Sequence, residues 1–177
     1  ARGVPVCRRG SGGTSIVAAP GCMFYAVLID LQLRPHLRML DAAHEYVMSR
    51  MSRGLQSLNP DTSWTGTCDL VIGNRKVGGN SLRIGRQWML YHGTLLLDMD
   101  LSWIERLLQH PPREPDYRGG RSHLDFVTNL HVTRQDVVEQ LRHAWQATEE
   151  YHDDLPLASV QRLVRERYLL NTWNRQR

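Results

Sequence analysis

One stretch of the chain, residues 35–56, repeats apolar positions with the period of one face of an α-helix. Pro35 stands where the first turn of a helix tolerates proline, because the nitrogen of that turn needs no hydrogen-bond partner. The pattern therefore predicts a helix over this stretch. Its core-facing residues are expected to be Met39, Leu40, Val47 and Met51.

Other stretches are rich in aliphatic, β-branched and aromatic residues, and these predict strands. They are residues 3–9, 15–17, 23–31, 68–77, 80–85 and 88–100. Ser102 and Glu105 have the spacing of a helix capping box. Thr133 with Asp136 predicts the start of another helix, and a last helix is expected over residues 156–170.

Strands and helices mix along the chain without strict alternation, which favours an α+β fold with a mixed sheet packed against helices. Residues 110–122 contain three prolines and two glycines, so no regular structure is expected there. No repeat, low-complexity segment or obvious linker divides the chain. We therefore expect a single domain over residues 1–177.

Composition narrows the possible functions. The chain is 41% hydrophobic and 23% charged, which is typical of a globular protein. A net charge of +4 favours acidic partners, but the arginines are scattered and no nucleic-acid-binding motif is present, so no nucleic acid partner is expected. No apolar run approaches the roughly 18 residues that span a bilayer, so no membrane partner is expected. Cys7, Cys22 and Cys68 lack metal-binding spacing, which predicts reduced thiols, no resident metal and a cytoplasmic location.

Lys76 is the single lysine among 22 lysine and arginine residues. It follows an apolar strand pattern and a Gly-Asn turn, and it precedes two glycines in the stretch "RKVGG". Lysine is a compact point charge on a thin stem, whereas arginine is a wide planar fork. A narrow site that needs one cation beside a phosphate or carboxylate would accept only lysine. The alternative is codon bias that left one lysine by chance.

Two further stretches carry candidate chemistry. In "RRGSGGTS", Arg8 and Arg9 precede a glycine-rich loop, where Gly12 and Gly13 allow the backbone to approach a ligand and hold an anion. This loop matches neither a Walker A motif nor a dinucleotide-binding fingerprint, so neither mechanism is inferred. Residues 92–94, His-Gly-Thr, begin an apolar strand, and a single histidine there is more often structural than catalytic.

Four blocks, "RRGSGGTSIVAAPG", "DLVIGNRKVGGNSLR", "YHGTLLLDMDL" and "GRSHLDFVTNL", occur in this order. Together they resemble the lipoate–protein ligase A family of the biotin/lipoyl ligase superfamily, and the resemblance covers nearly the whole chain. It implies an α+β catalytic domain that uses ATP and Mg²⁺ to convert lipoate into lipoyl-AMP. The lipoyl group then passes to a lysine of a lipoyl domain of a 2-oxoacid dehydrogenase complex, or of the glycine cleavage H protein.

The same resemblance implies the site residues. Lys76 corresponds to the family lysine that contacts the acyl carbonyl and the phosphate, and it is the predicted catalytic residue. The residues expected to bind ATP or the acyl-adenylate are Arg9, Ser11, Gly12, Gly13, Thr14, Ser15, Ile16, Val17, Asp69, Lys76, Gly79, His92, Gly93 and Thr94.

Three departures from the family pattern affect these expectations. The family usually has a third glycine where Thr14 stands, and a His-Asp pair in place of Ala18 and Ala19. The small C-terminal accessory domain of the family is not expected within this chain, and a separate chain could supply it. The glycine loop begins at residue 8 instead of several tens of residues later, so an N-terminal part of the family domain is expected to be missing.

Two other functions stay open from the sequence. The first is an octanoyltransferase of the same superfamily, which carries its acyl group as a cysteine thioester. No cysteine stands where such enzymes place the nucleophile. Cys68 is close to one such position but out of register with it. We expect Cys68 to be a small buried strand residue. The second alternative is an inactive ligase-like binding scaffold.

Overall fold

The computed structural model describes residues 3–176, and its contacts gather in two compact units. The larger unit comprises residues 13–148, and the smaller unit combines the residues up to Gly12 with those from Glu149 onward. The single domain expected from the sequence stays a prediction. Within residues 3–176, no helix has the length and apolar character needed to cross a membrane.

A five-stranded antiparallel sheet forms the centre of the larger unit. In their order across the sheet, the strands are β1 (Cys22–Asp30), β5 (Trp88–Leu96), β4 (Arg75–Ile84), β3 (Asp69–Ile72) and β2 (Thr62–Thr65). Short turns join β2 to β5 in sequence, and Gly73 makes the turn between β3 and β4 with a φ of 57°, which favours glycine. The α+β class is confirmed, with an antiparallel sheet in place of the mixed one expected.

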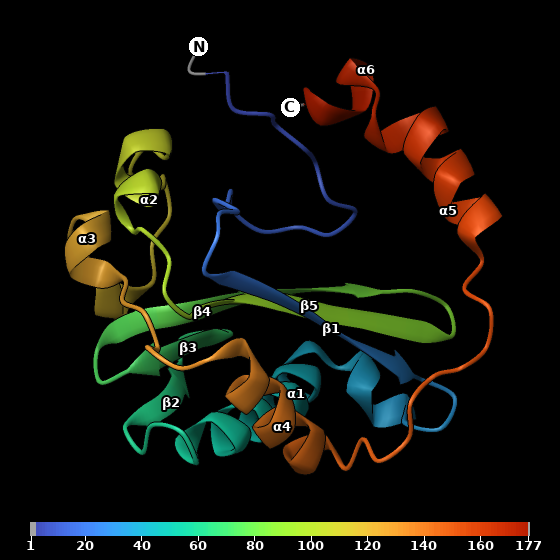
Figure 1. Cartoon of the computed structure of the whole chain (residues 1–177), viewed down its shortest axis with the longest axis horizontal. Coiled ribbons are helices and arrows are strands. Elements are labelled where there is room, and N and C mark those ends of the chain that lie inside the picture. Colours follow the sequence, from blue (N-terminus) through green and yellow to red (C-terminus); the bar gives the residue numbers. More distant parts are fainter. Residues whose placement is uncertain (1–2, 177) are drawn as a thin grey trace. The chain divides into compact units, whose positions relative to one another are not determined.

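Helices cover one face of this sheet. A 3-10 turn, η1 (Pro35–Arg38), precedes α1 (Leu40–Gln56), and α1 lies beside α4 (Arg134–Trp145) on this face (Figure 1). Val47 and Met51 are buried there, as predicted. Met39 and Leu40 are 70% and 55% exposed, so their predicted burial is wrong. Met39 lies in the break between η1 and α1, and Leu40 is the first residue of α1, so both lie before the buried stretch of the helix, which begins at Ala43.

Short helices follow β5 in the larger unit: α2 (Ser102–Leu107), η2 (Asp116–Arg118) and α3 (His123–Phe126). The smaller unit holds α5 (Leu157–Leu163), a π-helical turn η3 (Val164–Tyr168) and α6 (Asn171–Asn174). The helix predicted over residues 156–170 is therefore confirmed, although its second half is π-helical. Residues 3–9 and 15–17 form no strand, because no neighbouring strand supplies their backbone with a hydrogen-bonding partner.

The two predicted helix caps had different outcomes. Thr133 accepts a hydrogen bond from the Asp136 backbone nitrogen at 3.1 Å and caps α4, as predicted. The prediction of a capping box at Ser102 is wrong. The Asp100 carboxylate instead accepts a hydrogen bond from the Ser102 backbone nitrogen at 3.0 Å. Glu105 instead accepts from the His123 nitrogen at 3.1 Å, a tertiary contact that links α2 to α3.

Candidate active site

Lys76 lies on β4 next to a β-bulge. The register between β3 and β4 shifts by one residue, which leaves Val77 as the extra residue of β4. Val77 is fully buried, and a side chain at Gly78 would point into the core, so two consecutive positions face the helices. The bulge therefore turns Lys76 to the opposite side of the sheet, here called the outer face, where Gly79 also points.

On the outer face, Lys76 forms an ion pair with Asp69. The Nζ–Oδ1 distance is 2.7 Å, and the two side chains are 28% and 15% exposed. A Cβ added to Gly79 would lie 2.9 Å from both Cε and Nζ of Lys76. The ammonium group thus rests directly on the backbone of Gly79, and the missing side chain there gives it room.

Asp69, Gly79, Thr94 and Phe24 form one row across four strands of the outer face. Each is the register partner of the next, so their side-chain positions point to the same side of the sheet. His92 lies two residues from Thr94 on β5 and therefore faces the same side, one row further along. The structure thus places Asp69, Gly79 and Thr94 in one row on the face toward which Lys76 points, and their predicted contacts with ATP or the acyl-adenylate stay a prediction.

Gly93, between His92 and Thr94 on β5, faces the helices instead. A Cβ at this position would overlap the side-chain oxygen of Asn80. The Asn80 amide donates to the Cys68 carbonyl at 2.8 Å and accepts a hydrogen bond from the Tyr25 hydroxyl. Gly93 leaves room for the half-buried Asn80 amide on the helical side of the sheet, so packing accounts for the glycine.

The first part of the glycine loop belongs to the smaller unit. The Arg9 guanidinium donates through Nε to Ser11 Oγ at 3.2 Å and to the Gly12 carbonyl at 3.0 Å. The loop therefore curls around its own arginine. The neighbouring Arg8 nitrogen donates to Asn174 Oδ1 of α6 at 2.8 Å, which holds the loop against the end of the chain. The predicted contacts of this loop with a nucleotide stay a prediction.

The remaining predicted residues of the loop lie in the larger unit, outside any helix or strand. Gly13 has a φ of 95°, a conformation that favours glycine. Thr14, Ser15 and Ile16 are exposed, whereas Val17 packs against the buried cluster around Leu96. This segment leads into β1, so its end is fixed by the sheet.

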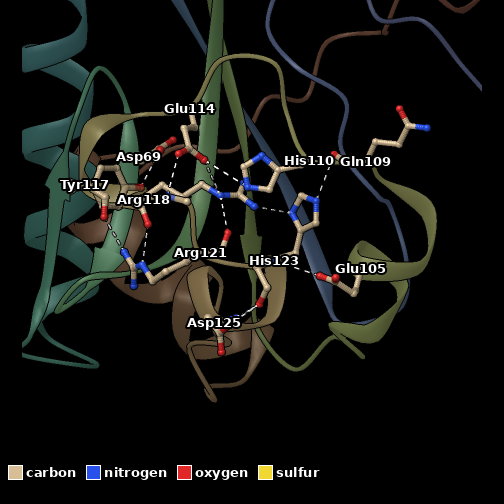
Figure 2. Close-up of polar contacts among 12 residues, drawn as sticks. Asp69, Glu105, Gln109, His110, Glu114, Tyr117, Arg118, Arg121, His123 and Asp125 are labelled. Carbon is tan, nitrogen blue, oxygen red and sulfur yellow. Dashed lines mark hydrogen bonds and ion pairs between the residues drawn. The ribbon is translucent and has the colours of Figure 1, made fainter.

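Sequence reasoning missed Tyr117. Its hydroxyl donates to Asp69 Oδ2 at 2.8 Å (Figure 2). Burial raises the pKa of Tyr117, and the Asp69 carboxylate raises it further, so the hydroxyl stays protonated and acts as a donor. Tyr117 is 48 residues from Asp69 in the chain and lies in the segment that prolines and glycines marked as irregular. No motif or spacing in the sequence connects the two.

The three cysteines are free thiols. Burial raises the pKa of Cys68, and the neighbouring Asp69 raises it further, against a smaller lowering by Lys76. Cys68 is half-buried in the turn that leads into β3, so the buried strand position expected for it is wrong, and its thiol donates to the Asn80 carbonyl at 3.3 Å. Burial also raises the pKa of Cys22, while Cys7 is exposed. A raised pKa works against a thiolate nucleophile at Cys22 and Cys68.

Residues 1–147 match the model of the lipoyl protein ligase A/B catalytic domain. The chain belongs to this family. Among relatives, lipoate–protein ligase 1 of Staphylococcus aureus is 27% identical over 139 residues, covering 78% of this chain and 41% of that protein. Octanoyltransferase LipM of Brevibacillus brevis is 26% identical over 121 residues, covering 62% of this chain and 44% of that enzyme. The relatives of this chain thus have names that refer to two activities, ligase and octanoyltransferase.

Solved structures have the same fold. A chain from the structure of a bi-partite lipoate protein ligase and its E2 lipoyl domain from Thermoplasma acidophilum has a TM-score of 0.76 at 17% identity, covering 96% of this chain and 69% of that one. Lipoate–protein ligase A bound with ATP has a TM-score of 0.71 at 18% identity, covering 97% and 72%. The chain spans only 41%, 36% and 52% of the length of three curated relatives.

Proposed function

We propose that this chain is the catalytic domain of an ATP-dependent lipoate–protein ligase. In the first step, a lipoate carboxylate oxygen attacks the α-phosphorus of MgATP, which forms lipoyl-AMP and releases pyrophosphate. In the second step, the ε-amine of an acceptor lysine attacks the acyl carbonyl and releases AMP. The observation that carries this proposal is the only lysine of the chain, seated over Gly79 and paired with Asp69.

Lys76 has the charge and position that the first step requires. Negative charge accumulates when a carboxylate approaches a triphosphate, and a preorganised cation stabilises that arrangement most in the transition state. The Asp69 carboxylate holds the ammonium in place before substrates bind. The bare backbone at Gly79 lets a ligand approach the ammonium closely.

The outer face also supports an aliphatic substrate. Phe24 lies in the row that contains Thr94, and Leu28 pairs with Leu90 two rows further along the same face. All three apolar side chains are exposed. An anionic head near the lysine and an apolar tail along β1 and β5 match the chemistry of lipoate, and equally that of octanoate.

The acceptor is proposed from the chemistry and from the relatives. The Thermoplasma ligase is described together with an E2 lipoyl domain, which supports a lipoyl domain of a 2-oxoacid dehydrogenase complex as acceptor here. That ligase is bi-partite, which supports a separate accessory chain as a second partner. The glycine cleavage H protein is the other acceptor that we propose to test.

Pyrophosphate release tests the proposal directly. The chain is mixed with MgATP and lipoate, with octanoate in a parallel reaction, and each reaction is repeated with a lipoyl domain and with H protein. Pyrophosphate that depends on the acid, followed by an acyl mass gain on the acceptor, is expected. Acyl transfer from octanoyl–acyl carrier protein without any ATP-dependent pyrophosphate would contradict it. The reaction with octanoyl–acyl carrier protein is included because one relative is an octanoyltransferase.

A cysteine-free variant separates ligase from transferase. We expect a chain with Cys7, Cys22 and Cys68 all changed to serine or alanine to keep its ATP-dependent activity, because the pKa of both Cys22 and Cys68 is raised by burial. Intact mass after incubation with octanoyl–acyl carrier protein should reveal no thioester adduct on the unmodified chain. An adduct that maps to Cys68 and disappears in Cys68→Ser would support the transferase instead.

A further inference from the structure

We propose that Tyr117 is a positioning residue for Lys76 and acts through the Asp69 carboxylate. This inference rests on the proposed function, because it assigns Lys76 to the reaction. The two oxygens of Asp69 have separate partners: Oδ1 accepts from Lys76 Nζ at 2.7 Å, and Oδ2 accepts from the Tyr117 hydroxyl at 2.8 Å. The three side chains therefore form a chain of contacts, Tyr117–Asp69–Lys76.

Tyr117 limits the motion of a pair that is otherwise flexible. A lysine side chain has a stem of four carbons, and an isolated ion pair contributes little unless its geometry is held. With a donor on each oxygen, the carboxylate of Asp69 cannot rotate without losing one contact. Its Oδ1 then keeps a defined direction toward the ammonium over Gly79.

The segment that carries Tyr117 is itself anchored. Arg118 is only 3% exposed, and its Nε donates to the Arg121 carbonyl at 3.0 Å (Figure 2). Glu114 accepts from the Gly120 nitrogen at 2.9 Å and pairs with Arg118 at 3.3 Å, so the segment is closed on itself. Because its neighbour is buried and paired, Tyr117 has little freedom to leave Asp69.

Arg121 connects this segment to the strand that carries the lysine. Its Nη2 donates to the Tyr117 carbonyl at 2.7 Å and to the Asn74 carbonyl at 3.0 Å, at the turn before β4. The Thr128 nitrogen, which follows α3 in the chain, donates to the Lys76 carbonyl at 2.9 Å. Hydrogen bonds to the backbone therefore fix the segment that carries the Tyr117 hydroxyl relative to the strand that carries Lys76.

The alternative role of Tyr117 is packing alone, since the centroid of its ring lies 5.2 Å from the centroid of the Phe126 ring. Tyr117→Phe separates the two roles, because it keeps the ring and removes only the donor. We expect Tyr117→Phe to lower the kcat of pyrophosphate release about 10-fold, the usual scale for a residue that orients a functional group, with little change in KM for lipoate or ATP. A loss of packing would instead lower the thermal midpoint.

A double-mutant cycle and a matched control sharpen this test. In an Asp69→Ala background the acceptor of the Tyr117 hydroxyl is already lost, so adding Tyr117→Phe is expected to change kcat no further. Tyr91→Phe also removes a hydrogen bond from a tyrosine, the one to His44 at 2.9 Å, but on the helical face of the sheet. Its kcat should match that of the unmodified chain. Additive effects of Tyr117→Phe and Asp69→Ala would overturn the proposal.

A second readout needs no activity. Because Lys76 is the only lysine, labelling lysine with ¹⁵N at Nζ gives one side-chain ammonium signal. We expect a signal protected from solvent exchange in the unmodified chain and in Tyr91→Phe, and faster exchange in Tyr117→Phe. An equally protected signal in Tyr117→Phe, or no protected signal in the unmodified chain, overturns the positioning role. If the unmodified chain forms no pyrophosphate, the proposed function fails, and this signal still decides whether Tyr117 holds Lys76.

Discussion

Lys76→Arg and Lys76→Ala should each lower the rate of acyl-adenylate formation by roughly 10²–10³-fold, the usual cost of losing one preorganised donor, while the chain stays folded. A Cβ added to Gly79 would lie 2.9 Å from Lys76 Cε and Nζ, so the thin lysine stem occupies the space that a side chain at residue 79 would need. The wide, planar guanidinium of arginine is expected to fit this place poorly. The arginine variant keeps the positive charge, so its failure would show that the shape of the cation matters in addition to its sign.

Pyrophosphate release measures this effect, and thermal unfolding shows that each variant is folded. Arg53→Lys provides the matched control, because it makes the reverse exchange at an exposed position of α1 on the helical side of the sheet. Its rate should equal that of the unmodified chain. A Lys76→Arg variant that reacted at the normal rate would contradict the role given to the ammonium, and the single lysine would then reflect codon bias.

Gly79→Ala should also cost roughly 10²-fold in rate without unfolding the chain, because it displaces the same preorganised donor. The added methyl would lie 2.9 Å from Lys76 Cε and Nζ, and a flexible side chain can move away from it. The fold is therefore expected to survive while the ammonium leaves its place beside Asp69. Pyrophosphate release and the thermal midpoint, measured on the same sample, separate the two effects.

Gly78→Ala is the control at the adjacent position. Its methyl would meet the Thr94 carbonyl oxygen at 2.6 Å and Leu95 Cδ2 at 3.0 Å, on the core side of β4. Backbone atoms cannot move aside cheaply, so this variant should lose about 1–3 kcal/mol of stability through overpacking. The prediction is contradicted if Gly79→Ala keeps its rate, or if it is the less stable of the two variants.

Local patterns in the sequence located several elements correctly. The helical period across α1 and the Thr133 cap of α4 were sufficient, because both depend on residues a few positions apart. The capping box at Ser102 was wrong for the opposite reason. Glu105 had a distant partner, the backbone of His123, and a tertiary contact replaced the local one.

The strand signals show the same limit. Residues 3–9 and 15–17 have strand-forming composition but find no partner strand, and a strand exists only when another segment completes its hydrogen bonds. Phe24 and Leu28 lie in the strand predicted over residues 23–31, and their apolar side chains are exposed on the outer face. Apolar character alone does not reveal which face of a sheet the helices cover.

The sequence by itself determined that one lysine, Lys76, stands beside glycines in a strand-forming stretch, and its ordered blocks pointed to Asp69, Gly79 and Thr94. The tertiary structure decided how they meet. In a regular strand, residues 76 and 79 would face opposite sides of the sheet, since side chains alternate along a strand. Only the pairing of β4 with β3 creates the bulge at Val77 that brings them to one face.

The place of Tyr117 in the site could be found only from the tertiary structure. Its contact with Asp69 joins segments that are 48 residues apart, and neither local period nor motif links them. The contact exists because Arg118 is buried beside it and Arg121 ties the segment to the turn before β4. A sequence pattern records which side chains are near each other along the chain, whereas a site is built from side chains that packing brings together in space.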